Sequence, residues 1–198
     1  MALYNSEYLK NLASRNRPLF ESEQRTYSVK ATPANTVFDI FLSHCFLDRE
    51  EVQGLYLELD NFGFKVYVDW LIDPHLDRTN VSKSSAKLIQ SRLKHSRTLL
   101  LAISINATMS KWMPWELGYV DGHTEKCAII PVSKERNSPK SFEGTEYLLL
   151  YPFIKKAKTN KGQDKLWVIE SEHSYSIFDT WKTDGIIRQN RAVNIYTI

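Results

Sequence analysis

A single acidic residue stands among tryptophans in the stretch from Ser110 to Leu117, and these side chains are able to do chemistry together. Trp112 and Glu116 are four residues apart, so that in a helix they share one face. The preceding run, Thr98 to Ser104, is apolar and predicts a strand buried on both faces of a parallel sheet. Ligands bind at the carboxyl ends of such strands. Packing of the indoles on the sheet, with Glu116 as an ordinary first-turn acid, explains the same residues.

One carboxylate with an aromatic partner suits the breaking of an N-glycosidic bond between a ribose and a pyridinium ring. The sugar passes through an oxocarbenium-like state, which a carboxylate stabilises electrostatically. Nicotinamide leaves as a neutral molecule, so no general acid is needed. Glu116 would hold ribose hydroxyls and offset the developing charge. Trp112 would stack on the cationic ring, an interaction worth roughly 0.5–2 kcal/mol.

Apolar runs alternate with helical stripes through the middle of the chain. Strands are predicted at Val37–Ser43, Lys65–Trp70, Thr98–Ser104 and Cys127–Ser133. Helices are predicted between them, by a stripe at Val52, Leu55, Tyr56 and Leu59, from Ser82 to His95, and after Ser110. This alternation predicts right-handed βαβ units and a flavodoxin-like, doubly wound α/β fold with a parallel sheet in the strand order 2-1-3-4-5.

The two ends of the chain show a different pattern. We expect one short N-terminal helix, followed by an extended lead-in over 17–35. After about residue 137 we expect strands at 146–154 and 165–169, a hairpin turn at Lys161-Gly162, and then a further helix and an end strand. The predicted parts are an N-terminal helix and lead-in (1–35), a central α/β domain (36–155) and a C-terminal α+β extension packed on it (156–198).

Other polar side chains follow the first two predicted strands. Ser43 and His44 end the first strand, and Asp69 and Trp70 end the second. In a sheet of this order the crevice opens where the connections from the first and third strands diverge, so these loops converge with the one that leads to Glu116. By position alone, we add His44, Asp69 and Trp70 to the expected site.

Composition and motifs exclude several classes of function. A net charge of +3, with Lys and Arg spread among acids, argues against a nucleic-acid partner. No glycine-rich phosphate loop follows a strand, and the five histidines lack ligand spacing, so we expect neither a bound cofactor nor a metal. Cys45 and Cys127 read as reduced core residues. We find no signal peptide or membrane span and expect a cytoplasmic protein.

Four blocks in order resemble the Toll/interleukin receptor (TIR) domain, in particular the bacterial branch that cleaves NAD. They are D-I-F-L-S-H-x-x-x-D from Asp39, G-F-K-V-Y-V-D from Gly63, L-L-L-A-I-S from Leu99 and S-x-W-x-x-x-E-L from Ser110. The resemblance implies a five-stranded parallel sheet and NAD as substrate. It also implies catalysis by Glu116, a tryptophan at the nicotinamide (Trp112) and a serine in the cleft (Ser43). The loop after the second strand, 70–82, departs from the family because it has no glycine.

The chain is similar to stand-alone TIR proteins of the Thoeris anti-phage type. That resemblance implies a cyclic ADP-ribose signal read by a separate effector protein, and homo-oligomers through TIR–TIR contacts. Two alternatives stay open. One is a non-enzymatic TIR scaffold, and the other is a nucleoside hydrolase or deoxyribosyltransferase, which would act on free nucleosides but not on NAD.

Overall fold

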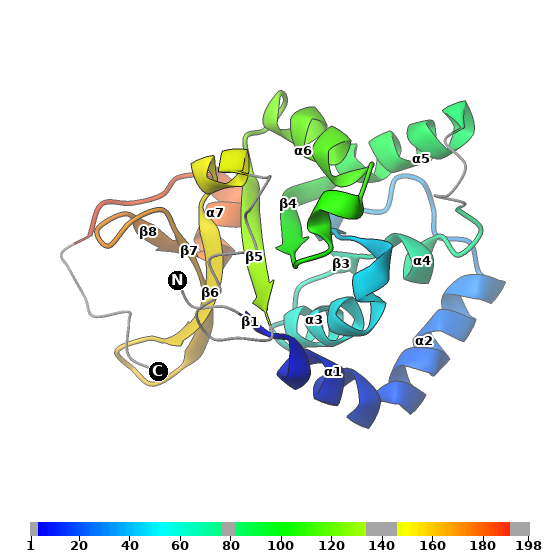
Figure 1. Cartoon of the computed structure of the whole chain (residues 1–198), viewed down its shortest axis with the longest axis horizontal. Coiled ribbons are helices and arrows are strands. Elements are labelled where there is room, and N and C mark those ends of the chain that lie inside the picture. Colours follow the sequence, from blue (N-terminus) through cyan, green and yellow to red (C-terminus); the bar gives the residue numbers. More distant parts are fainter. Residues whose placement is uncertain (1–3, 77–81, 134–145, 191–198) are drawn as a thin grey trace.

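One mixed sheet lies at the centre of the protein (Figure 1), whose computed structural model describes residues 4–76, 82–133 and 146–190. The strand order is β3-β2-β4-β5-β6-β7-β8, and β1 pairs with β5. The strands are β1 (Tyr4–Asn5), β2 (Phe38–Ser43), β3 (Val66–Tyr67), β4 (Ser96–Ile103), β5 (Cys127–Ser133), β6 (Phe153–Lys158), β7 (Asp164–Ile169) and β8 (Tyr175–Ile177). From β3 to β6 all neighbours are parallel, and β7 and β8 are antiparallel. The predicted parallel order 2-1-3-4-5 is confirmed.

Helices cover both faces of this sheet. They are α1 (Ser6–Arg15), α2 (Arg17–Val29), α3 (Arg49–Asn61), α4 (Asp69–Ile72), α5 (Lys83–Lys94), α6 (Met113–Asp121) and α7 (Phe178–Asp184), with short 3-10 turns at Phe46–Asp48 (η1), Ala107–Met109 (η2) and Glu146–Leu150 (η4). In Figure 1, α5 and α6 lie above the strands, and α1 and α3 lie below them. The apolar stripe of α3 is buried in the core, as its spacing predicts.

The helix α5 and the late hairpin form where the sequence predicts them. Ser82 caps α5, because its hydroxyl accepts a hydrogen bond from the backbone N–H of Ser85 at 3.1 Å. Gly162 has φ 79°, a left-handed conformation that glycine adopts without steric cost, and it turns β6 into β7.

The second predicted strand is wrong in its length. Pairing with β2 stops at Tyr67, and Asp69 and Trp70 belong to α4 instead. The backbone N–H of Ile72 bonds to the carbonyl of Val68 at 2.9 Å. Leu71 and Ile72 are both buried, so consecutive apolar residues enter the core by a helical turn rather than by strand alternation.

The predicted extended lead-in is also wrong, because α2 occupies most of it. Pro18 lies in the first turn of α2, where a missing N–H costs nothing, and Phe20 is buried. The tertiary contacts of Phe20 stabilise a helix whose sequence is polar.

The C-terminal predictions need smaller corrections. The first part of 146–154 is the turn η4, and the strand begins at Phe153. The predicted boundary at 155/156 falls inside β6, so the sheet runs through it. The helix of the tail is α7, with β8 before it, and the predicted end strand reaches residues outside the described ones.

The helices α1 and α3 cross in backbone contact at Gly54. A Cβ atom at this position would lie 2.0 Å from the carbonyl oxygen of Leu9. Because this oxygen belongs to the backbone, no change of side-chain rotamer can relieve the clash. We expect Gly54→Ala to destabilise the protein by about 1–3 kcal/mol through overpacking. Gly118→Ala is the matched control, since nothing lies within 4 Å of the added atom. Equal melting temperatures for the two variants in thermal unfolding would show that the crossing tolerates a side chain.

Candidate functional site

The carboxyl ends of β2 and β4 bring Ser43 and Glu116 together. The Ser43 hydroxyl donates a hydrogen bond of 2.5 Å to Oε2 of Glu116. Both side chains are 0% exposed. A buried carboxylate held by a hydroxyl has a defined direction, which is what electrostatic stabilisation of a developing positive charge requires.

The start of α6 sets the position of Glu116. Pro114 lies in the first turn, and the backbone N–H of Glu116 donates to the carbonyl of Trp112 at 2.8 Å. The helix begins at Met113 with Trp112 as its N-cap, so the predicted cap at Ser110 is displaced by two residues. The Ser110 hydroxyl still accepts from the N–H of Met113 at 3.3 Å. Leu117 and Val120 are also buried and hold the helix in the core.

Aromatic side chains follow one another along α6. Trp112 is 9% exposed and packs edge-on against Trp115, with ring centroids 5.5 Å apart. Trp115 is 37% exposed and continues to Tyr119, which stacks on His123 at 4.6 Å. Trp112 therefore belongs to the buried cluster near Glu116, and Trp115 lies at the surface.

His44, Asp69 and Trp70 form a second group on the other side of the β2 end. The indole Nε1–H of Trp70 donates to Nε2 of His44 at 2.9 Å. Nδ1 of His44 lies 2.9 Å from the carbonyl oxygen of Leu42, so the neutral ring carries its proton on Nδ1. Oδ1 of Asp69 lies 3.5 Å from Nε2. Consecutive residues thus face different helices: Ser43 contacts α6, and His44 contacts α4.

Asp48 ties the loop after β2 to the loop after β4. Its Oδ2 accepts from the Ser104 hydroxyl at 2.5 Å, and its Oδ1 accepts from the Asn106 side-chain amide at 2.7 Å. The Ser104 hydroxyl also accepts from the backbone N–H of Asn106 at 2.9 Å. Asp48 is buried. This clasp joins the two loops that flank the Ser43–Glu116 pair.

Removal of the clasp is expected to cost stability. Asp48→Ala leaves the Ser104 hydroxyl and the Asn106 amide without their charged acceptor, and hydrogen bonds of this kind contribute about 1.5–3 kcal/mol each. We expect a loss of about 2–3 kcal/mol in urea unfolding. Asp60→Ala removes the same charge from an exposed position on α3 and serves as the control. A loss no greater than that of the control would contradict the role of the clasp.

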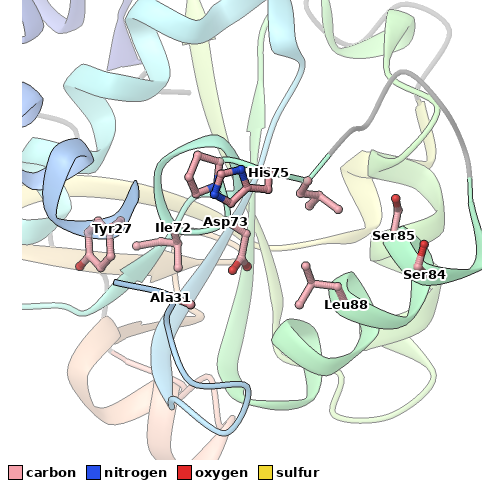
Figure 2. A pocket seen from close by; sticks show the side chains of 10 residues that line it. Tyr27, Ala31, Ile72, Asp73, His75, Ser84, Ser85 and Leu88 are labelled. Atoms are coloured by element: carbon pink, nitrogen blue, oxygen red, sulfur yellow. The ribbon is translucent and has the colours of Figure 1, made fainter. Parts of the chain in front are cut away.

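A separate cavity of about 440 Å³ opens between the end of α2, the segment after α4 and the start of α5 (Figure 2). Figure 2 shows Ser84, Ser85 and Leu88 on one side of it, with Ile72 and Asp73 facing them. Its walls are formed by Tyr27, Ala31, Ile72, Asp73, Pro74, His75, Leu76, Ser84, Ser85 and Leu88. None of the predicted site residues lines this cavity. The candidate site is therefore the region around the Ser43 hydroxyl and the Glu116 carboxylate, and it is chosen for these two groups.

Metal and thiol chemistry find little support in the described part of the chain. Within residues 4–76, 82–133 and 146–190, no cluster of three or more His, Cys, Asp and Glu side chains is placed to hold a metal. Cys45 and Cys127 are both free and buried, and burial raises the pKa of the Cys127 thiol to about 12 and also raises that of Cys45. Over the same ranges, no helix combines the length and apolarity that crossing a bilayer demands.

Residues 40–165 match the model of the TIR domain family. The chain belongs to this family. The matched TIR region begins inside β2 and ends inside β7, so α1 and α2 lie outside it. The whole of α6, the strand β5 and the clasp all lie within it.

Two curated relatives are both named as synthases of a cyclic ADP-D-ribose. A Bacillus cereus (strain MSX-D12) protein, named "Probable 3' cyclic ADP-D-ribose synthase ThsB'", is 40% identical over 175 residues, covering 88% of this TIR protein and 86% of the relative. A Cytobacillus dafuensis protein, named "Putative cyclic ADP-D-ribose synthase TIR2", is 26% identical over 84 residues, covering 42% of this chain and 22% of the relative. Among solved structures, the TIR domains of the activated Roq1 resistosome that recognises the effector XopQ match at 22% identity with a TM-score of 0.36, over 57% of this chain and 73% of that one.

Sequence reasoning missed parts of the site that depend on distant contacts. In the sequence, Asp48 is only the last residue of a motif and Ser104 only the end of a predicted strand. The hydrogen bond between them could not be predicted. The packing of Phe20 on Trp70 had no signal, because a lone phenylalanine in a polar segment does not reveal its partner.

Proposed function

We propose that this TIR protein cleaves the nicotinamide–ribose bond of NAD and cyclises the remaining ADP-ribose into a signalling nucleotide. The signal then activates a separate effector protein in anti-phage defence of the Thoeris type. The observation that carries the proposal is the buried Glu116 carboxylate, held by Ser43 at 2.5 Å at the carboxyl end of β2. The 40% identity to a relative named as a 3' cyclic ADP-D-ribose synthase supports the same chemistry and the same product class.

The reaction follows from the charge that develops on the sugar. The bond between the ribose C1′ atom and the pyridinium nitrogen breaks, and its electron pair neutralises the departing nicotinamide. Positive charge remains on C1′ and its ring oxygen, where the carboxylate of Glu116 stabilises it. The Ser43 hydrogen bond fixes the direction of the Glu116 carboxylate. NAD is the substrate, and the step uses neither a cofactor nor a metal.

Capture of the ribosyl cation decides the product. A hydroxyl of the same molecule attacks C1′ and releases a proton, which the Glu116 carboxylate takes up. Glu116 is 0% exposed, and exclusion of water from such a site favours the internal hydroxyl over hydrolysis. The product is therefore a cyclic ADP-ribose together with free nicotinamide, so atoms and charge balance.

The remaining site residues bind the substrate in this proposal. Trp112 lies at the nicotinamide side of Glu116. His44, Asp69 and Trp70 line the opposite side of the β2 end, where they are already fixed to one another by the contacts at 2.9 and 3.5 Å. Copies of the protein assemble through TIR–TIR contacts, and the effector is reached only by the diffusible nucleotide.

Product analysis by mass spectrometry tests the proposal. NAD is incubated with the purified protein and, separately, with lysate from phage-infected cells that express it. We expect nicotinamide and a cyclic product that co-elutes with a 3' cyclic ADP-ribose standard. Linear ADP-ribose alone would identify a hydrolase that depletes NAD. If neither preparation consumes NAD, the protein acts as a scaffold and the proposal fails.

A further inference from the structure

We infer that helix α2 positions Trp70 for the reaction and that Phe20 is the positioning residue. The inference rests on the proposed function, because it concerns the substrate cleft. It also gives a functional role to α2, which lies outside the matched TIR residues 40–165. In Figure 1, α2 runs beside α4, which carries Trp70.

The Trp70 ring is held from two directions. The ring of Phe20 packs against it with centroids 5.4 Å apart and an interplanar angle of 47°. The guanidinium of Arg49 lies 4.4 Å from the centroid of a Trp70 ring, within the range of a cation–π interaction. Phe20 is only 4% exposed, and Trp70 is partly exposed. The contact therefore orients a side chain that is still partly exposed.

The helix α4 needs such support because of its length. It comprises only four residues, Asp69–Ile72, and a single turn of helix is not stable without tertiary packing. Its N-terminal residues are the ones that contact His44. Packing from α2 thus fixes the direction in which the indole N–H of Trp70 points.

The orientation of Trp70 is passed on to the reacting groups. The indole N–H bonds to Nε2 of His44, and this bond holds the imidazole against the end of β2. The next residue toward the N-terminus is Ser43, which bonds to Glu116. A loose Trp70 would release His44, which the proposed function places among the substrate-binding residues.

The attachment of α2 to α3 provides an independent control. The Tyr56 hydroxyl donates to the Glu23 carboxylate at 3.0 Å, and the Tyr56 ring meets Phe20 edge-on at 5.9 Å. Tyr56→Phe removes the hydrogen bond between the helices but keeps the ring. This variant removes a polar contact between α2 and α3 and leaves the packing of Phe20 on Trp70 in place.

Steady-state kinetics with NAD tests the inference. For Phe20→Ala we expect KM to rise about fivefold with kcat nearly unchanged, the size that an aromatic pair contributes. A variant that only unfolds in part would instead lower the apparent kcat, because fewer molecules are active. Phe20→Leu, which keeps apolar bulk, is expected to restore part of the KM. Leu19→Ala on the exposed side of α2 and Tyr56→Phe are expected to keep the wild-type KM.

A double-mutant cycle shows whether Phe20 acts through Trp70. In a Trp70→Ala background, Phe20→Ala is expected to change KM less than twofold, whereas an independent role would multiply the two effects. An unchanged KM in Phe20→Ala, or a full fivefold effect in the Trp70→Ala background, overturns the inference.

A readout without NAD separates the inference from the proposed function. The indole N–H resonance of Trp70 is identified in ¹H–¹⁵N spectra by its loss in Trp70→Phe. We expect Phe20→Ala to shift this resonance and Leu19→Ala to leave it in place. If the wild type does not consume NAD but the shift occurs, the proposed function fails while the positioning contact stands. If NAD is consumed and the resonance does not move in Phe20→Ala, only the inference fails.

Discussion

Glu116→Gln is expected to lower the rate of NAD cleavage by a factor of about 10²–10³, the usual effect of removing one preorganised electrostatic group. Glutamine has the same shape as glutamate and its amide oxygen still accepts from the Ser43 hydroxyl, so the geometry of the pair is kept. Only the negative charge is lost. The measurement is the release of nicotinamide under single-turnover conditions, which isolates bond cleavage from product release.

The same variant carries a prediction for stability. Glu116 is 0% exposed, and a buried carboxylate loses hydration when the protein folds. We therefore expect the melting temperature of Glu116→Gln to equal or exceed that of the wild type, as is common where a site is built at the expense of stability. Glu50→Gln is the control for both measurements, since this side chain is 71% exposed on α3.

The activity of the two variants decides the catalytic assignment. Full activity in Glu116→Gln, or an equal loss of activity in Glu50→Gln, would refute it.

The second large effect is expected from Arg92→Met, which should destabilise the protein by about 3–5 kcal/mol because it breaks a buried ion pair. Arg92 is 1% exposed, and its Nε and Nη2 atoms each donate to the Asp73 carboxylate at 2.8 Å. The guanidinium also donates to the carbonyl oxygens of Pro33 and Thr32 at 2.7 and 2.9 Å. One side chain thus joins α5, the segment after α4 and the connection from α2 to β2.

A second substitution tests the cause of this loss. Arg92→Met leaves the Asp73 carboxylate as a poorly exposed charge without its cation, and Asp73→Asn in the same chain removes that charge. We expect the double variant to recover part of the stability, although the hydrogen bond from the Tyr67 hydroxyl to Asp73 at 2.9 Å is weakened. Arg97→Met is the matched control, because its side chain is 52% exposed and lies 3.6 Å from Asp39. Exposed pairs contribute about 0–1 kcal/mol. Denaturant unfolding that gives Arg92→Met the stability of Arg97→Met would contradict the prediction.

Much of the fold could be predicted because burial imposes a period on the sequence. The run from Leu99 to Ile103 is buried throughout, as a central parallel strand requires, and the stripe on α3 is buried as a helix requires. The start of α5 near Ser82 and the turn at Gly162 were also predicted, since each depends on neighbours a few residues away. The doubly wound parallel sheet followed from the alternation and from the handedness of βαβ units.

The failures occurred where distant contacts overrule local preference. The polar segment from Arg17 to Val29 reads as a loop, but Phe20 is buried against Trp70 and Tyr56 and makes it a helix. The run ending in Asp69-Trp70 is typical of a strand, but its pairing with β2 ends at Tyr67. Neither partner can be inferred from the residues beside it.

The sequence by itself determined the TIR fold class and predicted Glu116 and the loops around it as the candidate site, because residue type and spacing carry that information. Tertiary structure decided how the site is held together. Ser43 and Glu116 are 73 residues apart, and Asp48 and Ser104 are 56 apart, yet both pairs share hydrogen bonds of 2.5 Å. Such pairs arise only when the sheet places the ends of β2 and β4 side by side, and the orientation of Trp70 arises only when α2 packs on α4.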